Sequence, residues 1–425
     1  MKILIVGSGG REHALAWKVA QSSKVSSIYV APGNAGTELE QNIENINIEA
    51  IDIDGLLNFA KNNSIDLTII GPEVPLSLGI VDTFEANNLL CLGPTQKAAQ
   101  LESSKAFSKD FMQKYNIPTA AYKNFTNSEQ AKNYILDKKM PIVVKASGLA
   151  AGKGVVIAQN LIQANEAITD MLSGNLFGNA GCEIVIEEFL EGEEASFIVL
   201  VDGKNVVSMA SSQDHKARDD GDKGPNTGGM GAYSPAPVVT PDIHVRVLRD
   251  IIQPVVDGMN AEGSPYKGFL YAGLMIDKDS NIKTLEYNCR FGDPETQPIM
   301  MRLESDFVEL ALAAAKGDLT SVEAPKWRDE TALGVVLAAK GYPDSYPKGE
   351  VISGLDADDN VKTKIFHAGT KIVDGNVVTA GGRVLCAVAL GDCIEEAYVS
   401  AYNLADNIKW KNQYKRSDIG KKAFK

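Results

Sequence analysis

Three residues in an expected strand carry side chains that could hold a metal ion and an anion. Residues 283–290 read Lys-Thr-Leu-Glu-Tyr-Asn-Cys-Arg. In a strand, Glu286, Asn288 and Arg290 fall at i, i+2 and i+4 and point to one face. Magnesium takes oxygen ligands and bridges nucleotide phosphates, and arginine offers a bidentate fork to a carboxylate or phosphate. The pattern predicts a metal-assisted anion site, and the alternative is the polar solvent face of a strand.

A glycine-rich segment, residues 148–154, lies between two β-branched runs. It is one residue short of the P-loop spacing, and Gly154 stands where a hydroxyl would bind magnesium. A glycine loop between paired strands can instead fold over nucleotide phosphates, with Lys145 on the preceding strand directed at them. For Lys153 the alternative is a solvated loop charge.

A second glycine loop, residues 7–13, joins the first expected strand to a helix. Free backbone N–H groups and the helix dipole favour a phosphate there. Glu12 replaces the last glycine of the dinucleotide fingerprint, and no acid follows the second strand to hold a ribose, so a dehydrogenase is disfavoured. The loops at 32–36 and 71–73 are expected at the same edge of the sheet. The alternative is that the glycines only shape a tight turn.

The elements that must position these loops follow an α/β rhythm over the first hundred residues. Strands are expected at 2–6, 28–31, 67–70 and 89–92, with helices at 11–21, 54–62 and 76–87. A small α+β unit follows, and strands at 332–338, 364–367, 371–373 and 384–390 indicate a compact C-terminal domain ending in a helix. The basic residues of 409–425 are interpreted as a solvated helix face.

Composition excludes several classes of protein. The 425 residues exceed one ordinary core, so several domains are expected. A net charge of -13 disfavours general binding to nucleic acid or anionic membranes. The five cysteines are scattered without a C-x-x-C pair, and no segment is apolar enough to span a membrane, so a soluble cytoplasmic protein is expected.

The order of these features resembles the ATP-grasp superfamily of carboxylate–amine ligases. The order runs from Lys105 through Lys145 with its glycine loop to Glu-Glu-Phe-Leu at 187–190 and Glu-Tyr-Asn at 286–288. Within it, the chain resembles the phosphoribosylamine–glycine ligase family. The motifs that carry this resemblance are residues 7–14, 32–36, 212–216 (Ser-Gln-Asp-His-Lys), 224–231 and 290–295 (Arg-Phe-Gly-Asp-Pro-Glu).

The resemblance implies a fold and a reaction. The fold is α/β, with an N-terminal parallel α/β domain, a two-part ATP-grasp core and a small C-terminal α+β domain. The implied boundaries are 1–102 for the N-terminal domain, 103–122 with 191–325 for the core, 123–190 for the flap subdomain and 326–425 for the C-terminal domain. The implied reaction joins glycine to 5-phosphoribosylamine through glycyl phosphate, with ATP as co-substrate, in purine synthesis. A monomer is expected.

The resemblance also implies residue roles. Glu286 and Asn288 would bind Mg²⁺ or Mn²⁺. Glu194 resembles the ribose-binding acid, and the adjacent Glu193 leaves that choice open. ATP would be held by Lys105, Lys145, Gly148, Gly152, Lys153, Gly154, Glu187, Phe189, Leu190 and Glu194.

Charge complementarity makes Arg290 and Asp214 the catalytic candidates, for the carboxylate and the ammonium of glycine. The residues expected to bind the substrates are Gly9, Gly10, Asn34, Glu73, Asp214, Asn226, Arg290 and Asp293. His215 is either a base or, as we favour, a structural hydrogen-bonding residue. No covalent nucleophile is implied.

Three other functions remain open. Another purine-pathway ATP-grasp ligase would use formate or bicarbonate in place of glycine. A nucleotide-sensing protein without turnover would show an altered metal strand, and Glu286 and Asn288 are intact. A dehydrogenase is third.

Overall fold

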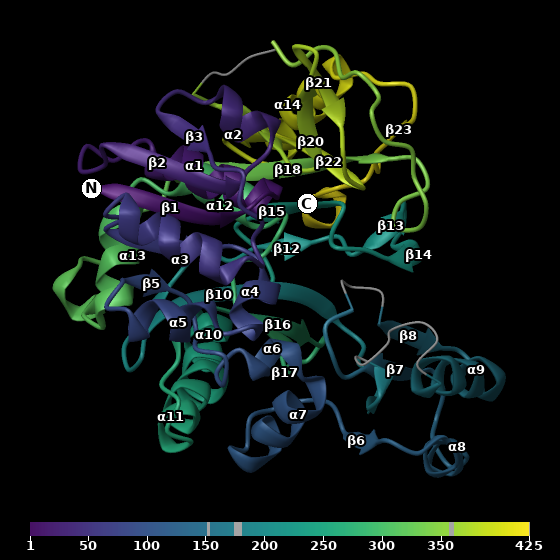
Figure 1. The fold of residues 1–425 in the computed structure, drawn as a ribbon. Coiled ribbons are helices and arrows are strands. Elements are labelled where there is room, and N and C mark those ends of the chain that lie inside the picture. The colour runs from purple at the N-terminus through teal and green to yellow at the C-terminus, as the bar shows by residue number, and fades with distance from the viewer. Residues whose placement is uncertain (151–153, 174–180, 357–360, 425) are drawn as a thin grey trace.

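The computed structural model describes residues 1–150, 154–173, 181–356 and 361–424, and its N-terminal region is built on a parallel sheet (Figure 1). The strand order is β3-β2-β1-β4-β5, with strands β1 (Lys2–Gly7), β2 (Ser27–Pro32), β3 (Ile43–Asn45), β4 (Leu67–Ile70) and β5 (Cys91–Leu92). The apolar run of β1 is buried on both faces, as parallel strands between helices require. The helices of this region are α1 (Gly10–Val19), α2 (Ala35–Leu39), α3 (Ile53–Asn62), α4 (Glu73–Ser77) and α5 (Ile80–Ala86).

The parallel α/β rhythm expected for these residues is confirmed, with two differences. The helix expected at 76–87 is divided into α4 and α5, because Gly79 between them takes a left-handed φ of 83°. The edge strand β3 was not expected, since three residues are too short to show a period of two.

A small antiparallel sheet projects from the body of the molecule (Figure 1). Its order is β6-β9-β7-β8, with strands β6 (Tyr122–Phe125), β7 (Ile142–Ala146), β8 (Val155–Ala158) and β9 (Ile184–Glu188). Helices α8 (Ser128–Ile135) and α9 (Leu161–Leu172) pack on it around a separate apolar core. Because β7 and β8 pair directly, the glycine loop between them is flanked by strands on both sides, as expected.

The body contains a second antiparallel sheet of order β11-β10-β16-β17. Its strands are β10 (Glu193–Asp202), β11 (Val206–Ser208), β16 (Lys267–Ile276) and β17 (Ile282–Asn288). One apolar cluster joins this sheet to the N-terminal sheet, with Val6 and Phe197 as members, so the two share a core. The helices around it are α6 (Gln100–Ser103), α7 (Lys105–Lys114), α10 (Pro241–Val247), a π-helix (Leu248–Ile252), α11 (Gln253–Ala261) and α13 (Phe307–Lys316), followed by a 3₁₀ turn (Leu319–Ser321). Helix α12 (Thr296–Arg302) packs on α1.

The C-terminal sheet combines strands from two distant parts of the chain. Its order is β12-β15-β18-β22-β19, with β23 also on β18. Strand β15 comes from the middle of the chain and pairs with β18 through Ala232 and Gly334, which the sequence order did not reveal. The elements are β12 (Gln213–Asp214), β15 (Gly231–Ser234), β18 (Thr331–Ala339), β19 (Thr363–His367), β22 (Arg383–Gly391), β23 (Gln413–Tyr414) and α14 (Ile394–Asn407), with hairpins β13 (Ala217–Asp219)–β14 (Lys223–Asn226) and β20 (Thr370–Val373)–β21 (Asn376–Thr379).

The interpretation of residues 409–425 as a solvated helix face is wrong. After α14 the chain forms β23 and ends in a 3₁₀ turn (Lys421–Ala423), and the side chain of Arg416 is buried inside the protein. Arg416 is 1% exposed and pairs with Asp222 at 3.0 Å and Asp418 at 2.7 Å, and it donates to the carbonyl of Ala217 at 2.9 Å. Arg416 therefore ties the tail to the β13–β14 hairpin through Asp222, which lies 194 residues earlier in the chain and leaves no local signal.

We expect Arg416→Met to destabilise the protein by about 2 kcal/mol, because two carboxylates lose their buried partner while still reaching water. The matched control is Lys422→Met, whose pair with Asp222 is half exposed and should be worth less than about 1 kcal/mol. Urea unfolding measures both. Equal losses in the two variants would contradict a buried clamp.

Candidate active site

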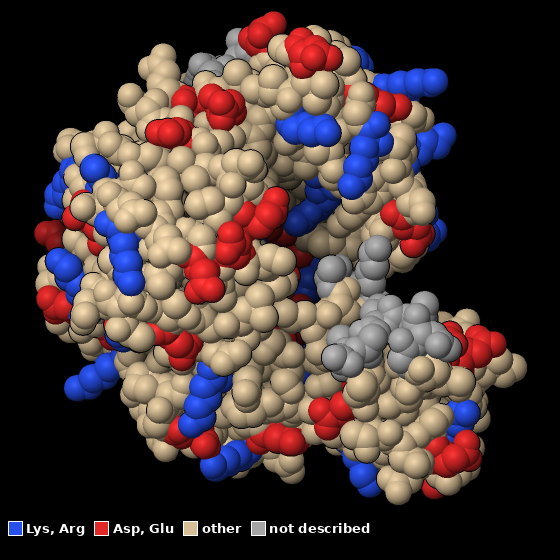
Figure 2. Space-filling model, in the orientation of Figure 1, with Lys and Arg blue, Asp and Glu red and all other residues tan. Residues whose placement is uncertain are grey.

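One cavity of about 720 Å³ gathers most of the side chains expected to do chemistry. It lies between the projecting sheet and the body, where Figure 2 shows a hollow with acidic and basic side chains at its edge. The expected residues that line it are Glu73, Lys105, Lys145, Gly154, Glu187, Phe189, Leu190, Glu194, Asp214, Asn226, Glu286, Asn288, Arg290 and Asp293. Residues as far apart in sequence as Glu73 and Asp293 thus line one cavity.

Other expected residues do not line this cavity. Gly9, Gly10, Asn34 and Gly148 are outside its wall, and Gly152 and Lys153 lie outside the described residues. Lys105 reaches the base of the glycine loop, donating to the carbonyl of Gly148 at 3.3 Å. Ser104 caps α7 by accepting from Phe107 N at 3.2 Å. This cap places Lys105 at the first position of the helix.

The lysine of β7 that the sequence pattern assigns to phosphate, Lys145, is paired with a buried carboxylate. Glu187 on β9 contacts Lys145 at 3.0 Å and Lys109 of α7 at 2.9 Å, and each of the three is at most 6% exposed. Burial lowers the pKa of Lys109 to about 8, while Glu187 opposes that shift. The Glu187 carboxylate therefore holds two ammonium groups rather than standing free toward a purine ring.

A third lysine connects two acids of the cavity. Lys216 forms an ion pair with Glu194 and lies 3.4 Å from Glu286. Although burial opposes the charge, Glu194 and Glu286 raise the pKa of Lys216 well above its usual value. Glu194 lines the cavity, and Glu193, its neighbour on β10, is exposed. Successive strand residues face opposite ways, so Glu194 faces the cavity and Glu193 does not.

Glu286 and Asn288 fit an oxygen-coordinated divalent ion. Although burial disfavours its charged form, Lys216 and Lys145 lower the pKa of Glu286 to about 2, so its carboxylate is ionised. The Asn288 amide satisfies its neighbours when its nitrogen faces Glu102, at 3.1 Å, which leaves its oxygen available as a ligand. Within the described ranges no cluster of three His, Cys, Asp or Glu could hold a metal. Two protein ligands plus substrate phosphates is the usual arrangement for Mg²⁺.

Arg290 is held between two acids that enter from the N-terminal side. Its guanidinium contacts Glu102 at 2.9 Å and Glu73 at 3.4 Å. Burial raises the pKa of Glu102 to about 7 against the effect of Arg290. Burial also raises the pKa of Asp214 well above its usual range, with Lys216 opposing. A bound ammonium would restore the ionised form of Asp214.

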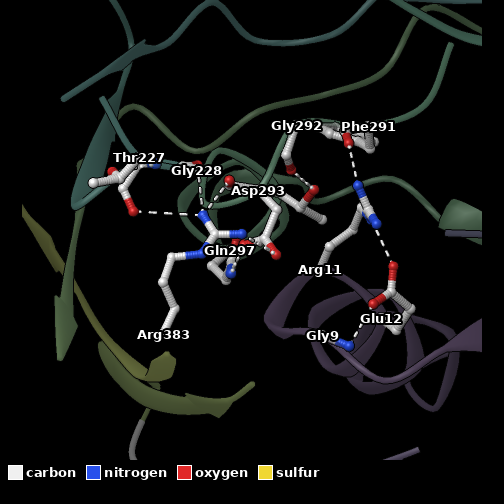
Figure 3. Close-up of polar contacts among 12 residues, drawn as sticks. Gly9, Arg11, Glu12, Thr227, Gly228, Phe291, Gly292, Asp293, Gln297 and Arg383 are labelled. Atoms are coloured by element: carbon white, nitrogen blue, oxygen red, sulfur yellow. Dashed lines mark hydrogen bonds and ion pairs between the residues drawn. The ribbon is translucent and has the colours of Figure 1, made fainter. Parts of the chain in front are cut away.

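An arginine of β22, Arg383, contacts two loops that line the cavity (Figure 3). Arg383 pairs with the carboxylate of Asp293 at 3.0 Å and donates to its carbonyl at 2.5 Å. The same side chain donates to the carbonyl of Gly228 at 2.6 Å, and the OH of Tyr342 accepts from Gly228 N at 3.0 Å. The C-terminal sheet thus fixes two loops of the site.

The first glycine loop closes around its own glutamate. Gly9 N donates to Glu12 Oε2 at 2.6 Å, and Arg11 pairs with Glu12 at 2.5 Å while donating to the carbonyl of Phe291 at 3.1 Å (Figure 3). A Cβ at Gly71 would lie 1.9 Å from Glu12 Oε1, so only glycine fits there. Glu12 therefore occupies part of the space in which the sequence suggested a phosphate.

The side chain of Asn34 makes its hydrogen bonds to other parts of the protein. Its Oδ1 accepts from Gly36 N at 2.8 Å, and its Nδ2 donates to the carbonyls of Ser8 and His367, both at 2.9 Å. The side chain thereby caps α2 and ties the first glycine loop to the C-terminal sheet.

His215 lies outside the cavity wall. It is 1% exposed, and its Nε2 accepts from Gly420 N at 3.3 Å. Burial lowers its pKa to about 4, so the ring is neutral at neutral pH. These contacts support the structural interpretation over that of a base.

Sequence reasoning missed several residues that hold the site. Lys109 lies one helical turn beyond Lys105, so helical spacing could have suggested it. Lys216 ends the 212–216 motif, which carried the resemblance without a role for the lysine. Glu102 and Arg383 have no local signal, because their partners lie 187 and at least 90 residues away.

Comparison with known proteins shows the family of this chain. Models of the phosphoribosylglycinamide synthetase N domain, ATP-grasp (A) domain and C domain match residues 1–102, 103–296 and 332–422. A phosphoribosylamine–glycine ligase of Vibrio vulnificus is 62% identical over 424 residues, covering 100% of this chain and 99% of the relative. One of Escherichia coli is 59% identical over 425 residues, covering 100% and 99%.

Solved structures show the same similarity. Phosphoribosylamine–glycine ligase of Thermotoga maritima has a TM-score of 0.86 at 36% identity, covering 99% of this chain and 100% of that one. Biotin carboxylase of Campylobacter jejuni shares the fold, with a TM-score of 0.75 at 15% identity over 97% and 92% of the chains.

Fold and site together define an ATP-grasp protein in which the nucleotide cavity lies between a projecting sheet and the body. The chain belongs to the phosphoribosylglycinamide synthetase family. Over the described ranges, none of its helices has the length and apolar character needed to cross a lipid bilayer.

The neutral, buried His215 predicts an acid-sensitive stability. Because its folded pKa of about 4 lies below the unfolded value, the unfolded state binds a proton first, and stability falls as pH drops from about 6.5 toward 4. Between about pH 7 and pH 5 we expect His215 to contribute a loss of about 2 kcal/mol.

The measurement is the free energy of unfolding in urea at both pH values for the wild type and for His215→Asn. The variant should show the smaller pH dependence, whatever its stability at pH 7. An unchanged pH dependence would contradict a neutral His215. The His244→Asn variant is the control, since His244 is only part-buried and its pKa is lowered by burial alone.

Proposed function

We propose that this chain is an ATP-dependent ligase that joins glycine to 5-phosphoribosylamine and forms glycinamide ribonucleotide, ADP and phosphate in purine biosynthesis. The observation that carries the proposal is one cavity lined by Lys105 and Lys145, by the oxygen donors Glu286 and Asn288, and by the guanidinium of Arg290. Relatives covering the full chain bear the name of this ligase.

Lys105 and Lys145 bind the phosphates of ATP, and the 148–154 loop covers them. Phe189 and Leu190, at the end of β9, meet the adenine, and Glu194 binds the ribose. The role of Glu187 is to hold Lys145, because its carboxylate is already engaged by two lysines. Gly148, Gly152, Lys153 and Gly154 supply the backbone and charge of the cover.

Glu286 and Asn288 would hold Mg²⁺ or Mn²⁺. When bound, the ion neutralises charge on the phosphoryl group that is transferred. The ionised state of Glu286 and the outward oxygen of Asn288 support this assignment.

Arg290 binds the carboxylate of glycine, and Asp214 binds its ammonium. Transfer of the γ-phosphoryl group to that carboxylate makes glycyl phosphate and ADP. The sugar amine then attacks the carbonyl carbon, forming the C–N bond as the C–O bond to phosphate breaks and the amine loses a proton. Positioning and fixed charge carry the catalysis, and no covalent enzyme intermediate is needed.

The phosphorylated amine is bound by Glu73, Asn226 and Asp293, which line the cavity. The loop at Gly9 and Gly10 lies next to Asp293, since a Cβ at Gly9 would be 3.3 Å from Asp293 Oδ2. Asn34 shapes that loop through its hold on Ser8.

The domain division at 1–102, 103–122 with 191–325, 123–190 and 326–425 remains our proposal, as do a monomeric state and the absence of a nucleic-acid partner. All five cysteines are unpaired, which supports a reducing, cytoplasmic location.

The substrate assignment is tested by measuring ADP formation with phosphoribosylamine and, in turn, glycine, formate and bicarbonate. We expect turnover with glycine alone. Turnover with formate or bicarbonate but not glycine would identify the alternative ligase. Nucleotide binding without any turnover would indicate the sensing protein.

We expect Glu286→Gln to lower ADP formation by about 100-fold or more, because the ionised metal ligand becomes a neutral amide. The fold should persist, as judged by circular dichroism. Glu44→Gln, on the exposed edge strand β3 and outside the cavity wall, is the control and should remain active. A Glu286→Gln variant with full magnesium-dependent turnover would refute the ligand assignment.

A further inference from the structure

One carboxylate contacts three consecutive residues at the end of the metal-binding strand. Glu102 of α6 is 9% exposed, and its Oε2 accepts from Cys289 N at 2.6 Å. Its Oε1 pairs with Arg290 Nη2 at 2.9 Å and, in the amide orientation that satisfies the neighbours of Asn288, accepts from Asn288 Nδ2 at 3.1 Å. A side chain 187 residues away in sequence thus contacts each residue from 288 to 290.

The contact with Asn288 decides which end of its amide faces the cavity. An amide nitrogen can only donate and its oxygen can only accept, so a carboxylate on one side orients the group. The carbonyl of Tyr287 also accepts from this nitrogen, at 3.2 Å. Asn288 Oδ1 is left without either neighbour and is presented as a hard ligand.

The contact with Arg290 fixes the position of its guanidinium relative to the Asn288 amide. Because both donors share Glu102 Oε1, the spacing between the amide and the guanidinium is set by one oxygen. Glu73 alone, at 3.4 Å from Arg290 Nε, would hold the guanidinium more loosely.

We propose that Glu102 is a positioning residue that orients Asn288 for the divalent ion and Arg290 for the substrate carboxylate. This inference rests on the proposed function, because it takes the metal and glycine assignments as given. Outer partners of metal ligands set the ligand's orientation, and losing one typically costs about 10- to 100-fold in metal affinity.

The test is Glu102→Gln, which keeps the size of the side chain but leaves a single acceptor oxygen for three donors. Mn²⁺ binding to the protein–ADP complex is measured by electron paramagnetic resonance, and ADP affinity is measured separately without metal. We expect Mn²⁺ affinity to fall roughly 10- to 100-fold and metal-free ADP affinity to stay unchanged. The KM for glycine should also rise in the Glu102→Gln variant, because Arg290, which binds the glycine carboxylate, would be held less firmly.

The matched control is Glu350→Gln. Glu350 also joins two distant segments, accepting from the backbone N of Asn412 at 3.0 Å and from its side-chain amide, but it lies outside the cavity wall. It should bind Mn²⁺ like the wild type. A loss of similar size in both variants would show a general structural effect and overturn the proposal.

A double-mutant cycle separates positioning from packing. In an Asn288→Ala background, Glu102→Gln should cause little further loss of Mn²⁺ affinity, because the group it orients is gone. Additive losses would overturn the proposal. If Glu102→Gln does not fold, the second variant is Glu102→Asp, whose shorter side chain keeps a carboxyl group but moves it away from the three donors. It must show the same loss of Mn²⁺ affinity with unchanged metal-free ADP affinity.

The outcomes also distinguish this inference from the function beneath it. Wild-type protein that binds no Mn²⁺ with ADP would overturn the metal assignment and this inference together. Wild-type protein that binds Mn²⁺, with a Glu102→Gln variant that binds equally well, would overturn the inference alone.

Discussion

The site depends on the rule that a charge removed from water needs a partner of opposite sign. Taking an ion out of water costs several kcal/mol, so an unpaired buried lysine or glutamate would discharge or disrupt the fold. Here Glu187 forms ion pairs with Lys109 and Lys145. Lys216 forms ion pairs with Glu194 and Glu286. Arg290 forms ion pairs with Glu73 and Glu102. These pairs keep charged groups in the wall of the cavity and hold each of them at a fixed place.

The pairing also explains why regions far apart in the chain must fold as one body. Glu102 comes from the segment after the N-terminal sheet, Lys145 from the projecting sheet, and Arg383 from the C-terminal sheet. Each contributes to the same cavity wall. Because every partner is remote in sequence, the site exists only when the sheets are packed together, and the shared apolar cluster of the N-terminal and central sheets holds two of them in place.

Local patterns predicted what is local. The alternation of Glu286, Asn288 and Arg290 placed three side chains on one face, and the structure has all three in the cavity wall. The loop between β7 and β8 was predicted from its flanking β-branched runs. By contrast, Asn34 donates to the carbonyl of His367, 333 residues away, and Glu12 packs against Gly71, and no linear pattern shows either contact. The same limit applies to Arg416, whose acidic partners include one from a hairpin nearly two hundred residues earlier.

The sequence by itself determined the parallel α/β start, the strand that carries the oxygen donors, the flanked glycine loop and the family resemblance. Those features depend on spacing within a few residues, where backbone geometry alone decides which way a side chain points. Only the tertiary structure decided that Glu187 holds two lysines, that Glu102 contacts three successive residues, and that β15 joins the C-terminal sheet. Those choices follow from burial and charge pairing between distant segments, which are properties of the packed chain.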